Sequence, residues 1–236
     1  SFTEKSVSKE REIIQQEIGM YQDSPDYRLF FGALENLYPG TPLADDIAGT
    51  RDSISDITID NLHENFDLFY HPSQMHLLVI GKFDVDPILQ VLKEYDQISQ
   101  LPSIKMERFP VEKNEVKLNQ SCRMDVATPK LAIGIRGNDD IKEEEKFRYK
   151  LMLKLLFSMM FGWTSQRFQS LYEAGKIDNS LTLEVEVEEL FHFVILTMDT
   201  KEPVSLSHQF RSAIKQFDKD PDVNQEHLDT IKSEMF

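Results

Sequence analysis

The chain has 236 residues, of which 40% are hydrophobic and 28% charged, enough apolar side chains for a globular protein of one or two domains. The formal net charge is −15, from 41 acidic and 26 basic residues. This balance, with no basic block, argues against nucleic acid or an anionic membrane as the main partner and favours cationic ligands such as basic peptides. Cys122 is the only cysteine, which excludes an intrachain disulfide and a cysteine-built zinc site.

The two ends of the chain bear on its location and completeness. No stretch has the length and hydropathy of a transmembrane helix, and the first residues are not typical of a signal peptide, so we expect a cytoplasmic chain. Helical patterns run up to both Ser1 and Phe236, with no starting Met and no polar tail. We therefore expect the chain to be a piece of a longer protein.

The first predicted element is a helix from residue 7 to residue 21. At about 100° per residue, one side of this helix collects an apolar stripe made of Val7, Ile13, Ile14, Ile18 and Tyr21. Glu10 and Glu17 fall in the middle of the same stripe, whereas Arg11 and Gln15 fall on the opposite side. A carboxylate on a core-facing stripe is expensive to desolvate, so it must be neutralised, paired with a cation or bound to a metal.

The rest of the first half mixes helices with one strand. A second helix is predicted from Asp26 to Tyr38, before Pro39-Gly40, and residues 41–55 are predicted to form a loop. Thr58 can cap a helix that runs to Tyr70. The apolar run 76–80 is typical of a buried strand, and the following helix has Asp86 as its cap and Pro87 at its first position. We assign residues 1–98 to one domain.

A second domain is predicted after a linker at residues 99–114. Its elements, in chain order, are strands at 115–127 and 130–136, helices at 143–161 and 164–174, a hairpin of strands 181–187 and 191–198, and helices at 204–217 and from 224 onward. The domain covers residues 115–236. The fold class is therefore α+β, with helices on one face of a largely antiparallel sheet.

Motif searches leave the role of the two glutamates open. They could be metal ligands, a general base or partners of a buried arginine, and by residue pattern alone the structural ion pair is the more frequent case. A catalytic zinc needs three protein ligands, but none of the six histidines lies in an H-x-x-E-H or H-E-x-x-H sequence. Serine-triad, P-loop and dinucleotide-binding motifs are absent as well.

A family resemblance separates these roles. The segment from Glu10 to Glu17, followed by Asp23-Ser24-Pro25, resembles the second signature of the pitrilysin or insulinase-type zinc peptidases, the inverzincins. Residues 42–57 and 69–84 match further family segments, and 133–137 and 164–171 match loosely. The resemblance covers almost the whole chain and is strongest toward cytoplasmic bacterial zinc proteases. It implies two-layer α/β sandwich domains of the mitochondrial-processing-peptidase type.

The resemblance also implies a site that is only partly present. Glu17 matches the third zinc ligand, and Glu10 matches the glutamate that supports the ligands from behind. The H-x-x-E-H segment, with two imidazole ligands and the general base that activates the zinc-bound water, would precede Ser1. On this basis we expect a zinc metalloendopeptidase that cleaves peptides in a closed chamber. The resemblance makes residues 1–98 the C-terminal part of the zinc-site domain and residues 115–236 a second peptidase-like domain, truncated at its C-terminal helix. The present chain would be inactive alone and would not hold zinc.

One departure from the family pattern concerns substrate binding. Active members carry an Arg and a Tyr that bind the substrate backbone, but Tyr172 stands at the Arg position and Asp178 or Asn179 at the Tyr position. The resemblance then implies the zinc-bearing subunit of a heterodimer whose homologous partner supplies the pair. Two alternatives remain: a non-catalytic scaffold subunit of the same family, and an α/β peptide-binding module without metal, in which Glu10 and Glu17 pair with buried cations.

Overall fold

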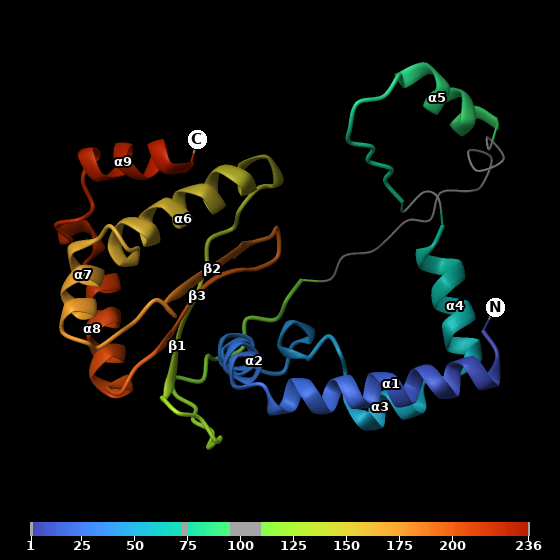
Figure 1. Ribbon diagram of the computed structural model, residues 1–236, viewed down its shortest axis with the longest axis horizontal. Coiled ribbons are helices and arrows are strands. Elements are labelled where there is room, and N and C mark those ends of the chain that lie inside the picture. Colours follow the sequence, from blue (N-terminus) through green and yellow to red (C-terminus); the bar gives the residue numbers. More distant parts are fainter. Residues whose placement is uncertain (1, 72–74, 95–109, 236) are drawn as a thin grey trace. The chain divides into compact units, whose positions relative to one another are not determined.

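The computed structural model describes residues 2–71, 75–94 and 110–235 (Figure 1). The chain divides into two compact units, Ser1–Ile18 with Ala48–Phe109, and Gly19–Ile47 with Pro110–Phe236. Residues 19–47 therefore group with the second half of the chain. The predicted domains, 1–98 and 115–236, stay a prediction, and most of the predicted linker at 99–114 lies outside the described residues.

The first unit consists of helices within its described part. These are most of α1 (Glu4–Asp23), α3 (Arg51–Asp56), α4 (Ile59–Phe69) and α5 (Val85–Glu94). Thr58 caps α4 as predicted, because its hydroxyl accepts the backbone N–H of Asn61. Thr50 caps α3 in the same way through Ser53, so the prediction of a loop over 41–55 is wrong for this short helix.

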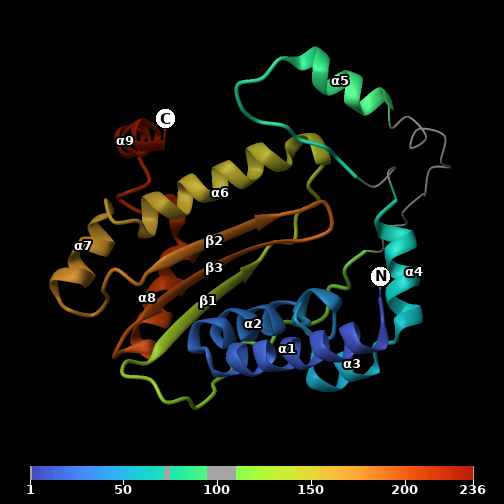
Figure 2. The same ribbon diagram turned by 45° about the vertical axis from the view of Figure 1, so that its right-hand side comes forward.

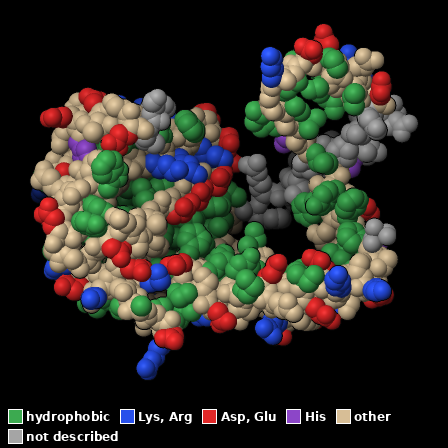
Figure 3. All heavy atoms as spheres, in the orientation of Figure 1, with side chains coloured by type: hydrophobic (Ala, Val, Ile, Leu, Met, Phe, Trp, Pro, Cys, Tyr) green, Lys and Arg blue, Asp and Glu red, His purple; other side chains and the backbone are tan. Residues whose placement is uncertain are grey.

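The predicted buried strand at 76–80 is a further correction. These residues form no strand, and Leu77, Leu78 and Ile80 are 67%, 79% and 86% exposed. A strand needs a neighbour to satisfy its backbone, and no strand is present in the described part of this unit. The run is nevertheless apolar, and green side chains also gather over α5 in Figure 3, where Val85, Leu89 and others are exposed.

The second unit is built on an antiparallel sheet in the order β1-β3-β2. Its strands are β1 (Lys130–Arg136), β2 (Thr182–Val187) and β3 (His192–Asp199), close to the predicted ranges. The strand predicted at 115–127 is wrong. Its Lys117 N–H bonds to the carbonyl of Asn36, at the end of a helix, in place of a strand partner.

Helices cover both faces of this sheet, whereas the sequence prediction placed them on one. On one face, α6 (Lys146–Phe161) and α8 (Pro203–Lys215) enclose a core with Val185, Val194 and Leu196. On the other, α2 (Pro25–Leu37) covers Phe193 and Ile195 (Figure 2). Gly134 of β1 permits this approach, because a Cβ there would meet Leu37 at 3.0 Å. The α+β class itself is confirmed.

Shorter elements complete the second unit. They are the 3-10 turns η1 (Pro42–Ala44), η4 (Glu143–Glu145) and η5 (Phe217–Lys219), with helices α7 (Gln166–Glu173) and α9 (Gln225–Met235). α9 packs against α6 on the side away from the sheet. None of the helices in the described ranges has both the length and the hydropathy required to cross a membrane.

Candidate functional site

Glu10 and Glu17 both lie on α1, and both are exposed. The helix begins after Thr3, whose hydroxyl accepts the backbone N–H of Ser6 while the Ser6 hydroxyl accepts the Thr3 N–H. Because Glu10 and Glu17 are exposed, neither carboxylate is desolvated. They do not form the buried ion pairs that a metal-free peptide-binding module would require.

The covered face of α1 differs from the predicted apolar stripe. Arg11 donates from Nη2 to the carbonyl of Ile57 at 2.7 Å, and Gln15 donates from Nε2 to Ser55 Oγ at 3.0 Å. Both had been predicted on the solvent side. These two polar side chains thus belong to the face that is turned to α3, and Ile18 is the buried residue of the helix.

A zinc ion does not fit the described residues by themselves. Across residues 2–71, 75–94 and 110–235, no three His, Cys, Asp or Glu side chains gather closely enough to hold a metal ion. A catalytic zinc requires three protein ligands. Glu17 can supply one carboxylate, so a complete site would need ligands from outside this set.

Tyr172 and Asn179 flank the end of α7, where the resemblance places the substrate-binding pair. Ser165 caps this helix by accepting the N–H of Phe168. The helix ends at Glu173 and is followed after Ala174 by Gly175, whose φ of 63° suits a residue without a side chain. The Tyr172 ring stacks on Phe168 with centroids 5.8 Å apart and is 45% exposed. Neither side chain carries the positive charge of an arginine.

The start of α7 is held by buried polar contacts that the sequence did not reveal. Arg167 Nη2 lies 2.6 Å from Oδ2 of the buried Asp220, and Nη1 donates to the carbonyl of Met160. The backbone N–H of Gln166 donates to Asp222 Oδ2 at 2.9 Å. These contacts fix α7, and with it Tyr172, against the C-terminal part of the unit.

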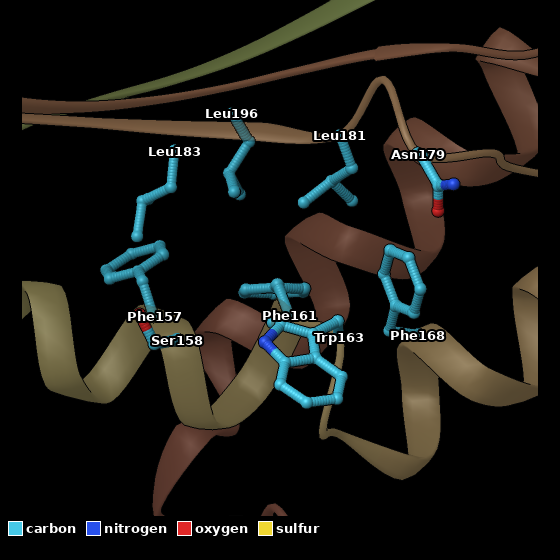
Figure 4. Close-up of a pocket in the computed structure, with 10 residues that line it drawn as sticks. Phe157, Ser158, Phe161, Trp163, Phe168, Asn179, Leu181, Leu183 and Leu196 are labelled. Carbon is cyan, nitrogen blue, oxygen red and sulfur yellow. The ribbon is translucent and has the colours of Figure 1, made fainter. Parts of the chain in front are cut away.

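An apolar pocket of about 290 Å³ lies beside Asn179 (Figure 4). The sheet contributes leucine side chains and the helices contribute aromatic rings; the lining residues are Phe157, Ser158, Phe161, Gly162, Trp163, Phe168, Asn179, Leu181, Leu183 and Leu196. Gly162 has no room for a side chain, because a Cβ would lie 2.4 Å from the carbonyl oxygen of Ser158. The sequence had indicated only a core helix here.

His192 is a buried histidine at the start of β3. Burial lowers its pKa, an effect opposed by the negative charge of Asp139. The ring packs edge-on against Tyr149, and its Nε2 has no hydrogen-bond partner among the described residues. The burial of His192 therefore disfavours the charged form of its ring.

Comparison with known proteins gives matches over most of the chain. Residues 56–235 match the family model described as the peptidase M16 inactive domain. The chain is 38% identical over 217 residues to an uncharacterised zinc protease of Bacillus subtilis, YmfH, a match that covers 90% of this chain and 51% of that protein. An uncharacterised zinc protease of Rickettsia felis is 27% identical, with 73% of this chain and 40% of that protein covered.

The fold has relatives among solved structures. An M16-like peptidase from Alicyclobacillus acidocaldarius superposes with a TM-score of 0.84 at 25% sequence identity, covering 100% of this chain and 56% of that chain. The present chain thus spans about half the length of the relatives it matches.

Proposed function

We propose, on the premise that this chain belongs to the peptidase M16 family and carries its inactive domain, that the full-length protein is a zinc-dependent endopeptidase that cleaves peptides in a closed chamber. The observation that carries the proposal is the match to zinc proteases over nearly the whole chain. In this proposal the chain contributes the non-catalytic domain and one zinc ligand, works in the cytoplasm, and is inactive alone.

Glu17 is the zinc ligand in this proposal, and Glu10 supports the ligand set. Their exposure on α1 leaves both carboxylates free to meet groups from the rest of the full-length protein. An ionised carboxylate is an acceptor that suits zinc and also the N–H of a ligating imidazole. The remaining ligands come from outside the described residues, since those residues cannot complete the site.

A homologous partner subunit supplies the substrate-binding pair. Tyr172 and Asn179 are neutral, so neither provides a guanidinium to hold a peptide carbonyl. The proposal therefore makes the full-length protein the zinc-bearing half of a heterodimer. The non-catalytic scaffold alternative differs in predicting that the full-length protein binds no zinc.

Zinc content tests the first part of the proposal. We expect purified full-length protein to hold one zinc ion per chain and the Glu17→Gln variant to lose it. Glu12→Gln, an exposed carboxylate on the same helix, is the matched control and should keep the metal. Stoichiometric zinc in the Glu17→Gln protein would remove Glu17 from the ligand set, and metal-free wild-type protein would favour the scaffold.

Peptidase activity tests the heterodimer. The zinc-loaded full-length protein should cleave a quenched fluorescent peptide library only when its homologous partner is added. Cleavage by the purified protein alone, at a rate unchanged by adding the partner, would contradict the two-subunit arrangement while leaving the peptidase assignment intact.

A further inference from the structure

Leucine side chains at β2 and β3 face the aromatic rings of the helices across the apolar pocket of the second unit. Leu181, Leu183 and Leu196 point toward Phe157 and Phe161 in Figure 4. None of the ten residues that line the pocket is charged. A charged ligand would lose its hydration here without gaining an ion-pair partner in the lining, which is unfavourable. The pocket therefore favours a neutral ligand.

The volume of the pocket, about 290 Å³, sets the size of that ligand. An apolar cavity of about 150 Å³ holds benzene, so this pocket has room for two fused aromatic rings. Ordered water suits it less, because a buried water needs about two to four polar partners and the lining is mostly apolar. Ring contacts with Phe157, Phe161 and Phe168 would stabilise an aromatic ligand beyond the effect of the buried area.

Two uncharged polar side chains border the pocket and have no hydrogen-bond partner within the described ranges of the chain. The hydroxyl of Ser158 makes no hydrogen bond there, although a serine inside a helix can donate to the carbonyl four residues earlier. The side-chain amide of Asn179, an exposed residue, makes none there either. A hydroxyl and an amide can each donate and accept, so together they suit one hydroxyl group on the ligand.

The rim of the pocket is held in place before any ligand binds. Trp163 borders the pocket and is 64% exposed, and its carbonyl accepts a hydrogen bond from Gln169 Nε2 of α7 at 2.5 Å. The hydroxyl of the next residue, Thr164, is hydrogen-bonded to His227 Nε2 of α9 at 2.8 Å. The turn that carries the indole is therefore fixed by two helices. A preformed site of this kind loses little conformational freedom when a ligand binds.

We propose that this pocket binds a small neutral aromatic compound that has two fused rings and one hydroxyl group. The compound is a free molecule and not part of a peptide, because the two free polar side chains match a single polar group better than the several amides of a peptide. The ligand would also contact Phe168, on which the ring of Tyr172 stacks with an interplanar angle of 13°. The proposal does not rest on the proposed function, since this binding needs neither zinc nor peptide cleavage.

Isothermal titration calorimetry of the full-length protein with 2-naphthol tests the proposal. We expect saturable binding with a dissociation constant below about 1 mM, an affinity within reach of a ligand of about eleven heavy atoms. Phenol, with the same hydroxyl on one ring, should bind at least about tenfold more weakly because it buries less apolar surface. 2-Naphthoate should also bind at least about tenfold more weakly, because its charge is desolvated in the pocket. The titrations use about 0.15 M salt, which screens the negative charge of the protein.

Variants locate the bound 2-naphthol. Leu181→Trp places a larger side chain in the pocket and should reduce the affinity at least about tenfold. The same substitution at Leu118, which is 71% exposed and does not line the pocket, should leave the affinity unchanged. Circular dichroism checks that each variant is folded. If Leu181→Trp does not fold, Trp163→Ala replaces it, since this exposed residue can be truncated and its loss removes a ring from the rim. We then expect several-fold weaker binding, with Phe147→Ala, at an 80% exposed aromatic residue of α6, as the unchanged control.

Unchanged affinity of the folded pocket variant would place the 2-naphthol elsewhere on the protein and overturn the proposal, as would the absence of measurable binding. Affinities for phenol or 2-naphthoate equal to that for 2-naphthol would overturn the assigned class of ligand. N-acetyltryptophanamide carries two fused rings on a peptide backbone, and binding as tight as that of 2-naphthol would assign the pocket to a protein side chain instead. Binding of 2-naphthol by a protein without peptidase activity would support this inference and count only against the proposed function. A peptidase that does not bind 2-naphthol would do the reverse.

Discussion

The backbone of Gly137 lies against the imidazole of His192, so closely that a Cβ on Gly137 would be 1.7 Å from Nε2. The Gly137 N–H donates to the His192 carbonyl at 2.8 Å, and the hydroxyl of Tyr38 donates to the same oxygen. The carbonyl and the ring of His192 thus connect the end of β1, the start of β3 and the end of α2.

This contact predicts that Gly137→Ala is destabilising. The new methyl group must displace a buried ring, and such overpacking costs about 1–3 kcal/mol in the free energy of unfolding. Urea unfolding followed by Trp163 fluorescence measures the effect. Gly32→Ala is the control, because no atom lies within 4 Å of a Cβ there and alanine favours a helix by up to about 1 kcal/mol. Equal stabilities of the two variants would contradict the close contact.

The same histidine predicts a loss of stability in mild acid. Burial lowers the pKa of His192 in the folded state below its ordinary value of 6.5, so between these two values the unfolded state binds more protons. The free energy of unfolding should therefore be fully retained above pH 6.5 and decrease as the pH falls below it, levelling off below the folded-state pKa. Urea titrations at a series of pH values measure this slope, and His192→Gln should reduce it.

Arg167 and Lys150 should differ sharply in what their removal costs. Arg167→Ala leaves the carboxylate of Asp220, only 1% exposed, without its ion-pair partner, and breaking a buried pair on one side costs about 3–5 kcal/mol. Lys150→Ala breaks a pair whose side chains are 30% and 35% exposed, which should cost no more than about 1 kcal/mol and less in high salt. Urea unfolding of both variants compares the two costs. Similar losses of stability in the two variants would show that the burial of Asp220 does not determine the cost of removing its partner.

Local patterns predicted most elements of the second unit. The bounds of β2 and β3 were predicted within one or two residues. The signals were the alternation before Val187 and the continuous apolar run from Phe193 to Leu196. A continuous apolar run of this kind is also typical of a strand that is buried on both faces of its sheet. The sequence could not show that α2, about 160 residues earlier, covers the second face, because such pairing depends on contacts far apart in the chain.

Sequence patterns did not predict the covered face of α1 or the apolar pocket. Counting apolar residues on α1 misplaced its covered face, since the long side chains of Arg11 and Gln15 reach backbone and hydroxyl acceptors across that face. The pocket was missed because its lining residues, from Phe157 to Leu196, come from separate helices and strands that only the folded chain brings together. The roles of Glu10 and Glu17 stay predictions.

The exposed run 76–80 gives a last prediction about the first unit. Leu77, Leu78 and Ile80 are large apolar side chains in water, although the run has the composition of a buried strand. If residues 1–98 are the C-terminal part of the zinc-site domain, as the family resemblance implies, the rest of the full-length protein supplies the neighbouring strand.

Amide hydrogen exchange measures this completion. Peptides covering 76–80 should exchange quickly in the 236-residue chain and at least about tenfold more slowly in the full-length protein, since backbone pairing removes the amides from water. Peptides covering β3 are the internal control, because that strand is paired on both sides in this chain and its protection should be the same in both proteins. Equal, fast exchange of the run in both proteins would mean that the remaining part of the protein does not pair with it.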